Sequence, residues 1–139
     1  MPPDLSIVII NFNTPELTAS AVRSILDTRE NLRLEILIVD NASTRGNIRQ
    51  ALEPLRTETQ TLEAEQLIRI HIIQQTHNLG FTGGNNIGIK NSSADVVLLL
   101  NSDTLVQPGC LQQCLDYLRE HPGVGVLGPK LLNPDGTRQ

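Results

Sequence analysis

Hydrophobic residues in this chain gather in short runs, and four of these runs end in a cluster of polar residues. The runs are rich in β-branched residues, which predicts strands that are buried on both faces of a sheet. Apolar residues at helical spacing fill the intervals between the runs, so strand and helix alternate. This alternation predicts an α/β fold with a doubly wound, mostly parallel sheet and helices on both faces. The predicted strands are residues 5–10, 34–39, 68–73 and 96–100, with residues 124–127 as a fifth candidate.

Proline and small polar residues mark the ends of the predicted helices. Thr14 followed by Pro15 is typical of a helix start, because Thr caps well and Pro suits the first turn. Pro54 lies inside a helical pattern, so we expect it to end or kink that helix. The polar residues 57–65 are predicted to be a variable surface stretch. The predicted helices begin at Pro15, at Ser43 or Thr44, at Asn85 and at Pro108, and the last ends at residues 121–123.

The four polar clusters are expected to meet in space, since the carboxyl ends of parallel strands lie along one edge of a sheet. Ligands of open α/β proteins bind in the crevice outside that edge. The clusters bring two carboxylates, several amides and a glycine-rich segment, which together suit a phosphorylated, hydroxyl-rich ligand. They comprise residues 11–13, 40–43, 77–86 and 101–103.

Each chemical group in these clusters has a functional and a structural interpretation. Asp40 either accepts hydrogen bonds from a nucleoside or caps the following helix. Asp103 either holds Mg²⁺ or Mn²⁺ against a diphosphate or belongs to a polar turn. The glycine-rich residues 80–84 open a helix whose start favours anions, although they match neither the Rossmann nor the phosphate-loop spacing. The amides of Asn78, Asn85 and Asn86 either serve ligand hydroxyls or satisfy the loop's own backbone.

Composition narrows the choice of partners. The net charge of −4 and the 2% aromatic content argue against a nucleic-acid surface. The N-terminus has no signal-peptide pattern, and no apolar run reaches the length of a membrane span, so we expect a cytoplasmic location. Cys110 and Cys114 are interpreted as small apolar residues that fill space in the core.

The end of the chain bears on the domain organisation. The turn signal at residues 133–136 is followed by only three residues, so we expect no returning strand there. We therefore expect a domain over residues 1–139 that is the front part of a longer protein.

In their order along the chain, five segments resemble the start of a family-two glycosyltransferase of the GT-A fold, especially its rhamnosyltransferase-like branch. The resemblance implies a Rossmann-like sheet that is truncated at its C-terminal side. It also implies transfer of a sugar, with inversion, from a nucleoside diphosphate to a hydroxyl of a saccharide or lipid-linked acceptor. UDP or dTDP donors fit the family better than GDP donors. Polysaccharide or cell-wall biosynthesis, at the inner face of the membrane for the full-length protein, is the implied setting. The five segments are residues 6–13, 39–44, 78–81, 99–103 and 125–136.

The resemblance also implies roles for individual residues. The triplet 101–103 stands where the family has its Asp-x-Asp element, and Asp103 matches the metal-binding aspartate. Asn101 replaces the first acid, so one carboxylate is missing and Mg²⁺ or Mn²⁺ is held less firmly. The catalytic base lies in the acceptor-binding part of the family, so we expect residues 1–139 alone to bind nucleotide without transferring sugar. The implied nucleotide-sugar site comprises Asn11, Phe12, Asn13, Asp40, Asn41, Asn78, Gly80, Asn85, Asn101, Ser102 and Asp103.

Two other functions compete with this hypothesis. One is a non-catalytic nucleotide-binding module with a regulatory role. The other is a nucleotidyltransferase or dinucleotide-binding domain, against which the absent phosphate-loop and Rossmann spacings count. Comparing the binding of NAD, nucleoside triphosphates and nucleotide sugars distinguishes a nucleotidyltransferase or dinucleotide-binding domain from the glycosyltransferase and from the regulatory module.

Overall fold

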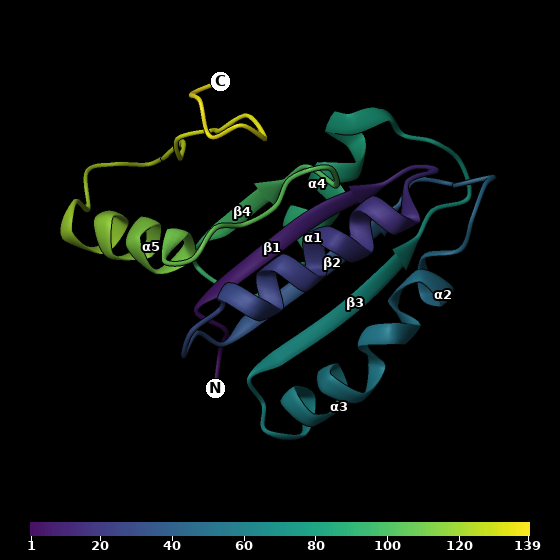
Figure 1. Ribbon diagram of the computed structural model, residues 1–139, viewed down its shortest axis with the longest axis horizontal. Helices are drawn as coiled ribbons and strands as arrows, with labels where there is room; N and C mark the ends of the chain where they lie inside the picture. The colour runs from purple at the N-terminus through teal and green to yellow at the C-terminus, as the bar shows by residue number, and fades with distance from the viewer.

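Four parallel strands form the sheet, in the spatial order β3-β2-β1-β4 (Figure 1). The computed structural model describes residues 1–139. Asn11 pairs with Asp40, and Asp40 pairs with Gln74, so three strands end level with one another. The predicted parallel sheet is confirmed, and its carboxyl ends do share one edge. The strands are β1 (Leu5–Asn11), β2 (Leu34–Asp40), β3 (Ile68–Gln74) and β4 (Val97–Leu100).

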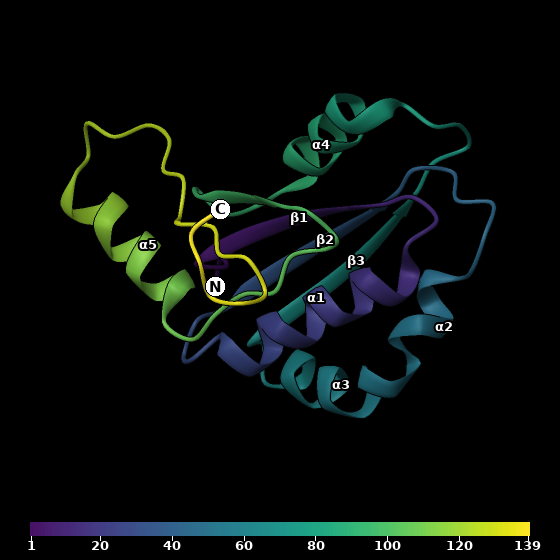
Figure 2. The same cartoon turned by 45° about the horizontal axis from the view of Figure 1, so that its top comes forward.

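Helices cover both faces of this sheet, as predicted (Figure 2). Helices α1, α2 and α3 lie on one face, and α4 lies on the other. A short 3₁₀ helix, η1, joins α2 to α3. The bounds are α1 (Pro15–Thr28), α2 (Ile48–Leu52), η1 (Glu53–Leu55), α3 (Arg56–Ala64), α4 (Gly80–Asn91) and α5 (Cys110–Glu120).

The chain reverses its direction across the sheet after β3. From β1 to β3 each strand is added on one side, whereas α4 carries the chain back so that β4 pairs with the free edge of β1. Right-handed crossovers then require α4 to lie on the face opposite α1. The boundary between β1 and β4 is therefore the topological switch point, where open α/β sheets form a crevice for ligands.

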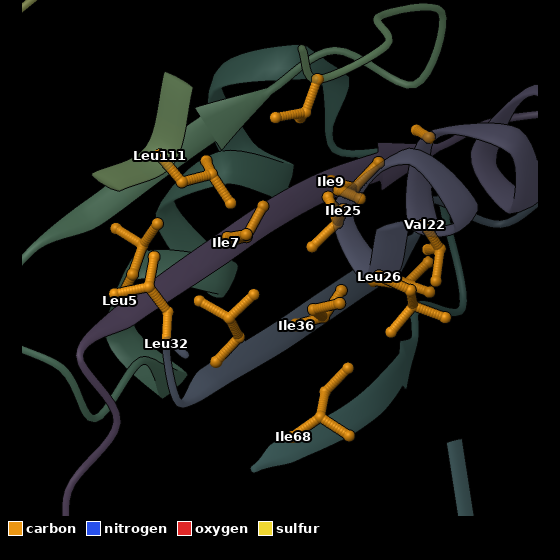
Figure 3. Packing of buried hydrophobic residues seen from close by; sticks show 14 of the residues in the cluster. Leu5, Ile7, Ile9, Val22, Ile25, Leu26, Leu32, Ile36, Ile68 and Leu111 are labelled. Carbon is orange, nitrogen blue, oxygen red and sulfur yellow. The ribbon is translucent and has the colours of Figure 1, made fainter. Parts of the chain in front are cut away.

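The larger hydrophobic core is entirely aliphatic and lies between the sheet and α1 (Figure 3). Ile7 and Ile36, on neighbouring strands, have no exposed surface, and neither has Ile25 of α1. Full burial of such a side chain stabilises the fold by about 1.5–3 kcal/mol. Leu111 from α5 reaches the same core, so α5 packs on the α1 side of the sheet.

Helix α4 approaches the opposite face of the sheet closely because it presents glycines there. A Cβ on Gly88 would overlap the Cγ1 atom of Val8, and a Cβ on Gly84 would come within 2.9 Å of Ile10 Cδ1. Both glycines are buried. The glycines at these two positions therefore serve helix–sheet packing rather than a phosphate-binding loop.

A buried carboxylate ties the loop between α4 and β4 to the sheet, at the end remote from the carboxyl edge. Glu35 Oε2 accepts hydrogen bonds from Ser6 Oγ at 2.6 Å and from the Ser93 backbone N–H at 2.8 Å, and Oε1 accepts one from Ser93 Oγ at 2.9 Å. Burial alone raises the pKa of Glu35, but these hydrogen bonds outweigh it and leave the pKa below its usual value. His71 Nε2 lies 4.0 Å from Oε1, at the exposed margin of this cluster.

Several predicted helix boundaries are wrong. The second helix begins at Ile48, because Asn47 rather than Ser43 or Thr44 accepts the first backbone hydrogen bonds. The third begins at Gly80 rather than Asn85. The fourth begins at Cys110 instead of Pro108, after Gly109 takes a left-handed φ of 78°. The expectation for Pro54 is confirmed, because α2 ends at Leu52 and Pro54 lies in the 3₁₀ turn η1 that follows.

Three other segments differ from expectation. The polar residues 57–65 are largely helical, within α3, which buries no residue. Residues 124–127 form no strand, and Val126 is 91% exposed. The turn at residues 133–136 does have a returning segment, although a minimal one, because Leu132 forms an antiparallel bridge with Arg138.

The two cysteines are free and half-buried. None of the helices combines the length and the hydropathy needed to cross a membrane.

Candidate functional site

A hollow of about 420 Å³ opens at the switch point between β1 and β4. Its floor and walls come from the end of β1, the first turns of α1 and α4, and the loop after β4. Three of the four polar clusters predicted to meet thus contribute to one place. The lining residues are Ile10, Phe12, Thr14, Leu17, Phe81, Asn101, Ser102 and Asp103.

The lining of this hollow divides into a polar part and an apolar part. Asn101, Ser102 and Asp103 supply amide, hydroxyl and carboxylate groups, and both Asn101 and Asp103 are exposed. Phe12 and Phe81 supply apolar surface and are 43% and 61% exposed. A ligand that suits this lining has one anionic or hydroxyl-rich part and one flat or apolar part.

Buried polar groups behind the hollow hold the loops after β1 and β2 together. Asn11 Nδ2 donates to Asp40 Oδ2 at 3.1 Å, and Asn11 Oδ1 accepts from Thr18 Oγ1 at 2.9 Å. Asp40 Oδ1 accepts from the Ser43 backbone N–H at 2.8 Å. Asn11 has no exposed surface and Asp40 is 4% exposed, so both act in this structure by positioning their neighbours. Asp40 does not cap the following helix, because Asn47 does so; its own contact is a local one, to the backbone of the loop after β2.

Asn13, in the loop after β1, also bonds to the loop after β2. Its Oδ1 atom accepts from the backbone N–H groups of Thr44 and Arg45 at 2.8 and 2.9 Å. Its own N–H donates to Ser43 Oγ at 2.9 Å. Asn13 adopts a φ of 58°, in the left-handed region that asparagine tolerates better than most residues. The two loops therefore form one rigid rim beside the hollow.

Asn41 organises the approach to α4. Its Nδ2 group donates to Asn78 Oδ1 at 2.8 Å and to the Gly80 carbonyl at 3.0 Å, while its Oδ1 accepts from the Leu79 N–H at 2.9 Å. Asn85 Nδ2 donates to the Phe81 carbonyl at 3.1 Å. Asn78 Oδ1 also accepts from the Gly80 N–H at 2.8 Å. Asn78 and Asn85, like Asn41, thus bond to the loop's own backbone, which was one of the two alternatives predicted for Asn78 and Asn85.

The predicted site residues therefore fall into two groups. Phe12, Asn101, Ser102 and Asp103 line the hollow, whereas Asn11, Asp40, Asn41 and Asn85 are buried behind it. Asn13, Asn78 and Gly80 belong to the loops that these buried groups hold. The lining residues that the sequence did not identify as site residues are Ile10, Thr14, Leu17 and Phe81.

Of the four, Phe81 alone carried a usable signal. It is one of only two phenylalanines in the chain, and it lies inside a motif that the resemblance includes. Thr14, Ile10 and Leu17 sit in ordinary cap, strand and helix patterns, which mark them as structural. Thr14 nevertheless links the rims, since its Oγ1 lies 3.3 Å from Ser102 Oγ.

The chain offers a limited set of ligands for a divalent cation. No group of three histidine, cysteine, aspartate or glutamate side chains converges anywhere in the structure. Asp103 is the single carboxylate that lines the hollow, with the oxygen atoms of Asn101 and Ser102 near it in sequence. Oxygen ligands suit Mg²⁺ and Mn²⁺, which are commonly held by one or two carboxylates together with substrate phosphates. The residues therefore fit a cation that arrives with a diphosphate.

A second hollow, of about 460 Å³, lies between α1, α2 and η1. Its charged groups, Arg23 and Asp27, pair with each other at 3.3 Å, and Arg23 also pairs with Glu58. It contains none of the predicted site residues and lies away from the carboxyl edge of the sheet. We therefore place the candidate site at the first hollow.

Comparison with known proteins identifies relatives of the chain. A family model described as Glycosyl transferase family 2 matches residues 6–139. The O-antigen biosynthesis protein RfbC of Myxococcus xanthus is 31% identical over 140 residues, which are 99% of this chain and 10% of that protein. The low-salt glycan biosynthesis hexosyltransferase Agl10 of Haloferax volcanii is 28% identical over 137 residues, which are 96% of this chain and 38% of that protein. The chain thus spans about a tenth of the length of the first relative and less than two-fifths of the length of the second.

Solved structures show the same fold. A mannosyltransferase from Pyrobaculum calidifontis, solved in complex with GDP-Man and Mn²⁺, superposes with a TM-score of 0.72 at 19% identity, covering 97% of this chain and 37% of that one. TarS from S. aureus, residues 1–349 in complex with UDP-GlcNAc, superposes with a TM-score of 0.62 at 17% identity, covering 95% and 40%. These likenesses show that the fold is of the GT-A type.

Proposed function

Because this chain belongs to glycosyltransferase family 2, we propose that it binds a nucleoside-diphosphate sugar in the hollow at the β1–β4 switch point. In the whole protein, the sugar is transferred to an acceptor hydroxyl. The observation that carries the proposal is the divided lining of this hollow. Asp103 and its neighbours suit a diphosphate, and the exposed ring of Phe12 suits a nucleoside.

The residues take two kinds of role in this proposal. Asp103 holds the divalent cation, with Asn101 and Ser102 beside the diphosphate. When bound, the cation neutralises the charge that develops on the departing diphosphate. Phe12 and Asn13 contact the nucleoside from the rim. Asn11, Asp40, Asn41, Asn78, Gly80 and Asn85 keep that rim and the start of α4 in place, which is the preorganisation that binding requires.

Transfer requires a base that removes the acceptor proton during attack on the anomeric carbon. Asp103 is the one acidic residue in the hollow and is committed to the cation, so we assign the base to the acceptor-binding part of the whole protein. Residues 1–139 by themselves are then a donor-binding unit without transfer activity. Inversion at the anomeric carbon, as in the rhamnosyltransferase-like branch, is the proposed stereochemistry.

The relatives support a particular setting. The names of two of them refer to O-antigen and glycan biosynthesis, and two solved neighbours hold GDP-Man and UDP-GlcNAc. We propose a saccharide or lipid-linked acceptor in polysaccharide or cell-wall biosynthesis, on the cytoplasmic side of the membrane. UDP or dTDP is the proposed carrier of the sugar.

Calorimetric titration tests the donor site directly. UDP, dTDP and GDP are titrated into the 139-residue chain, with and without Mn²⁺. We expect UDP or dTDP to bind more tightly in the presence of Mn²⁺, and Asp103→Ala to remove that dependence without changing the fold, because Asp103 is exposed. Asp40→Ala should weaken nucleotide binding by loosening the rim beside Phe12.

The matched control is Asp95→Ala, which removes an exposed acid that makes no ion pair and does not line the hollow. It should bind nucleotide as the wild type does. A folded wild-type chain that binds none of the three nucleotides would contradict the proposal. Binding that ignores Mn²⁺ and Asp103 would instead favour the regulatory nucleotide-binding module.

A further inference from the structure

We propose that Phe81, on the first turn of α4, forms the second wall of the nucleobase slot and stacks on the base of the donor. The inference rests on the proposed function, which places the nucleoside beside Phe12. It adds a specificity-determining residue that lies far from Phe12 in the sequence and on a different element.

The first argument is the unusual exposure of the ring. The chain has two phenylalanines and one tyrosine. Both phenylalanines remain outside the aliphatic core, and both line the same hollow. Phe81 is 61% exposed, although burying a phenylalanine is worth about 1.5–3 kcal/mol. Exposed apolar groups that gather at one hollow indicate a surface for a ligand rather than a packing role.

The second argument is that the backbone around this exposed ring is held rigidly. The Gly80 carbonyl accepts from Asn41, and the Phe81 carbonyl accepts from Asn85, at 3.0 and 3.1 Å. Both asparagines are nearly fully buried, with exposed fractions of 2% and 6%. Gly80 adopts a φ of 71°, a conformation that an L residue there would resist. Two buried amides and a turn that requires glycine thus fix the backbone that carries a solvent-exposed side chain.

The third argument is the space between the two rings. Phe12 and Phe81 line one hollow, yet the one stacked ring pair in the structure is Tyr117 with His121. The two phenylalanine rings therefore do not stack on each other, and the hollow of about 420 Å³ that both of them line is open to a ligand. A planar base inserted there would bury both ring faces, while its diphosphate reaches the polar side at Asp103. Stacking of this kind is worth about 1–3 kcal/mol for each aromatic side chain.

The experiment compares nucleotide with a base-free ligand. Phe81→Ala, Phe81→Tyr and the wild type are titrated with the tighter binder of UDP and dTDP, and with pyrophosphate, both in Mn²⁺. We expect Phe81→Ala to bind the nucleotide about 5- to 150-fold more weakly, and Phe81→Tyr to bind it within about threefold of the wild type. Pyrophosphate affinity should change less than about twofold, because the diphosphate does not touch the ring.

Leu105→Ala provides a matched control, since Leu105 is 60% exposed and lines the other hollow. It should bind nucleotide as the wild type does. Proton NMR gives a second readout that needs no pyrophosphate binding. Stacking between two rings shifts the H6 proton of the base upfield in the complex, and Phe81→Ala should reduce that shift.

The outcomes separate this inference from the proposed function. A wild-type chain that binds no nucleotide overturns both. A wild type that binds nucleotide, with Phe81→Ala equal to Leu105→Ala and an unchanged H6 shift, overturns the role of Phe81 alone. An equal loss of nucleotide and pyrophosphate affinity also overturns it, since Phe81 would then act through the diphosphate.

Discussion

The side-chain amide of Asn41 donates to Asn78 Oδ1 at 2.8 Å, across 37 positions of the sequence. This contact joins the turn after β2 to the segment that leads into α4. The same amide group holds the Gly80 carbonyl, and its oxygen holds the Leu79 N–H. One buried residue therefore sets the position of the helix start that forms a wall of the candidate site.

Removal of this residue should affect both stability and binding. We expect Asn41→Ala to lower the free energy of unfolding by about 1–3 kcal/mol, because the Leu79 N–H and the Gly80 carbonyl lose their partner. Nucleotide affinity should fall as well, since α4 would no longer hold Phe81 in place. Urea unfolding followed by circular dichroism, with calorimetry for binding, measures the two effects. Asn91→Ala, which removes an exposed amide at the other end of α4, should change stability by less than about 0.5 kcal/mol.

A second prediction concerns Glu35 and pH. Hydrogen bonds from Ser6 and Ser93 outweigh burial and hold the pKa of Glu35 below its usual value. The folded state therefore favours the carboxylate form of Glu35. The stability that this form adds is fully present above the pKa that Glu35 has in the unfolded chain, and it is lost as the pH falls through the lower pKa of the folded state. Urea unfolding from about pH 7 to about pH 3 should show Glu35→Gln less stable at neutral pH by about 1–3 kcal/mol and approaching the wild type in acid.

Glu63→Gln supplies the control for this experiment. Glu63 lies on the exposed surface of α3 and makes no ion pair. Its curve should run parallel to that of the wild type over the whole pH range. A constant gap between wild type and Glu35→Gln down to the lowest pH would contradict the proposed role of the Glu35 carboxylate.

The packing of α4 on β1 leads to a third prediction. Gly88→Ala places a methyl group against Val8. Although alanine is a better helix former by about 1 kcal/mol, the overlap should give a net loss of about 1–3 kcal/mol in the free energy of unfolding. Gly125→Ala is the comparison, because nothing lies within 4 Å of a Cβ at that position. Unfolding by urea is the measurement, and equal stability of the two variants would show that α4 can move away from the sheet without cost.

The fourth prediction concerns the proposed metal site, which lacks the first acid of the Asp-x-Asp element that the family resemblance implies. Asn101→Asp adds a second carboxylate to the hollow, two positions before Asp103. Because a further charged oxygen ligand strengthens binding of a hard cation, we expect Mn²⁺ to improve nucleotide affinity by roughly tenfold more than in the wild type. Titrations with and without Mn²⁺ measure the ratio. Asn91→Asp adds the same charge far from the hollow and should leave the ratio unchanged.

The strands were predictable because their signal is local. Each is a short, mostly aliphatic run, as in residues 34–39, and its polar end follows directly, although only β1 and β2 are largely buried. Helix α3 was missed for the opposite reason. It buries no side chain, so no apolar stripe marks it. Residues 124–127 misled because alternating valine and glycine suits a strand, but a strand also needs a partner, and pairing is a property of the whole sheet.

The candidate site was predictable in its location and only partly in its detail. The polar clusters at strand ends placed it at the carboxyl edge. The sequence did not reveal which asparagines face a ligand and which face the protein. Asn11 and Asn101 each follow an apolar strand, yet the first has no exposed surface and the second is exposed. That difference depends on the hydrogen-bond partners of Asn11, of which Asp40 and Ser43 come from a distant part of the chain.

The central place of β1 in the strand order has a consequence for synthesis on the ribosome. β1 is made first, but one of its two partners is β4, and Ser6 pairs with Val97. At about 5–20 residues per second, a further 5–20 seconds or so pass before that partner has been made. During this interval one side of a strongly apolar strand has no neighbour, which is the condition under which nascent chains aggregate. We therefore expect the early chain to depend on a chaperone, or on slow emergence, until β4 closes the sheet.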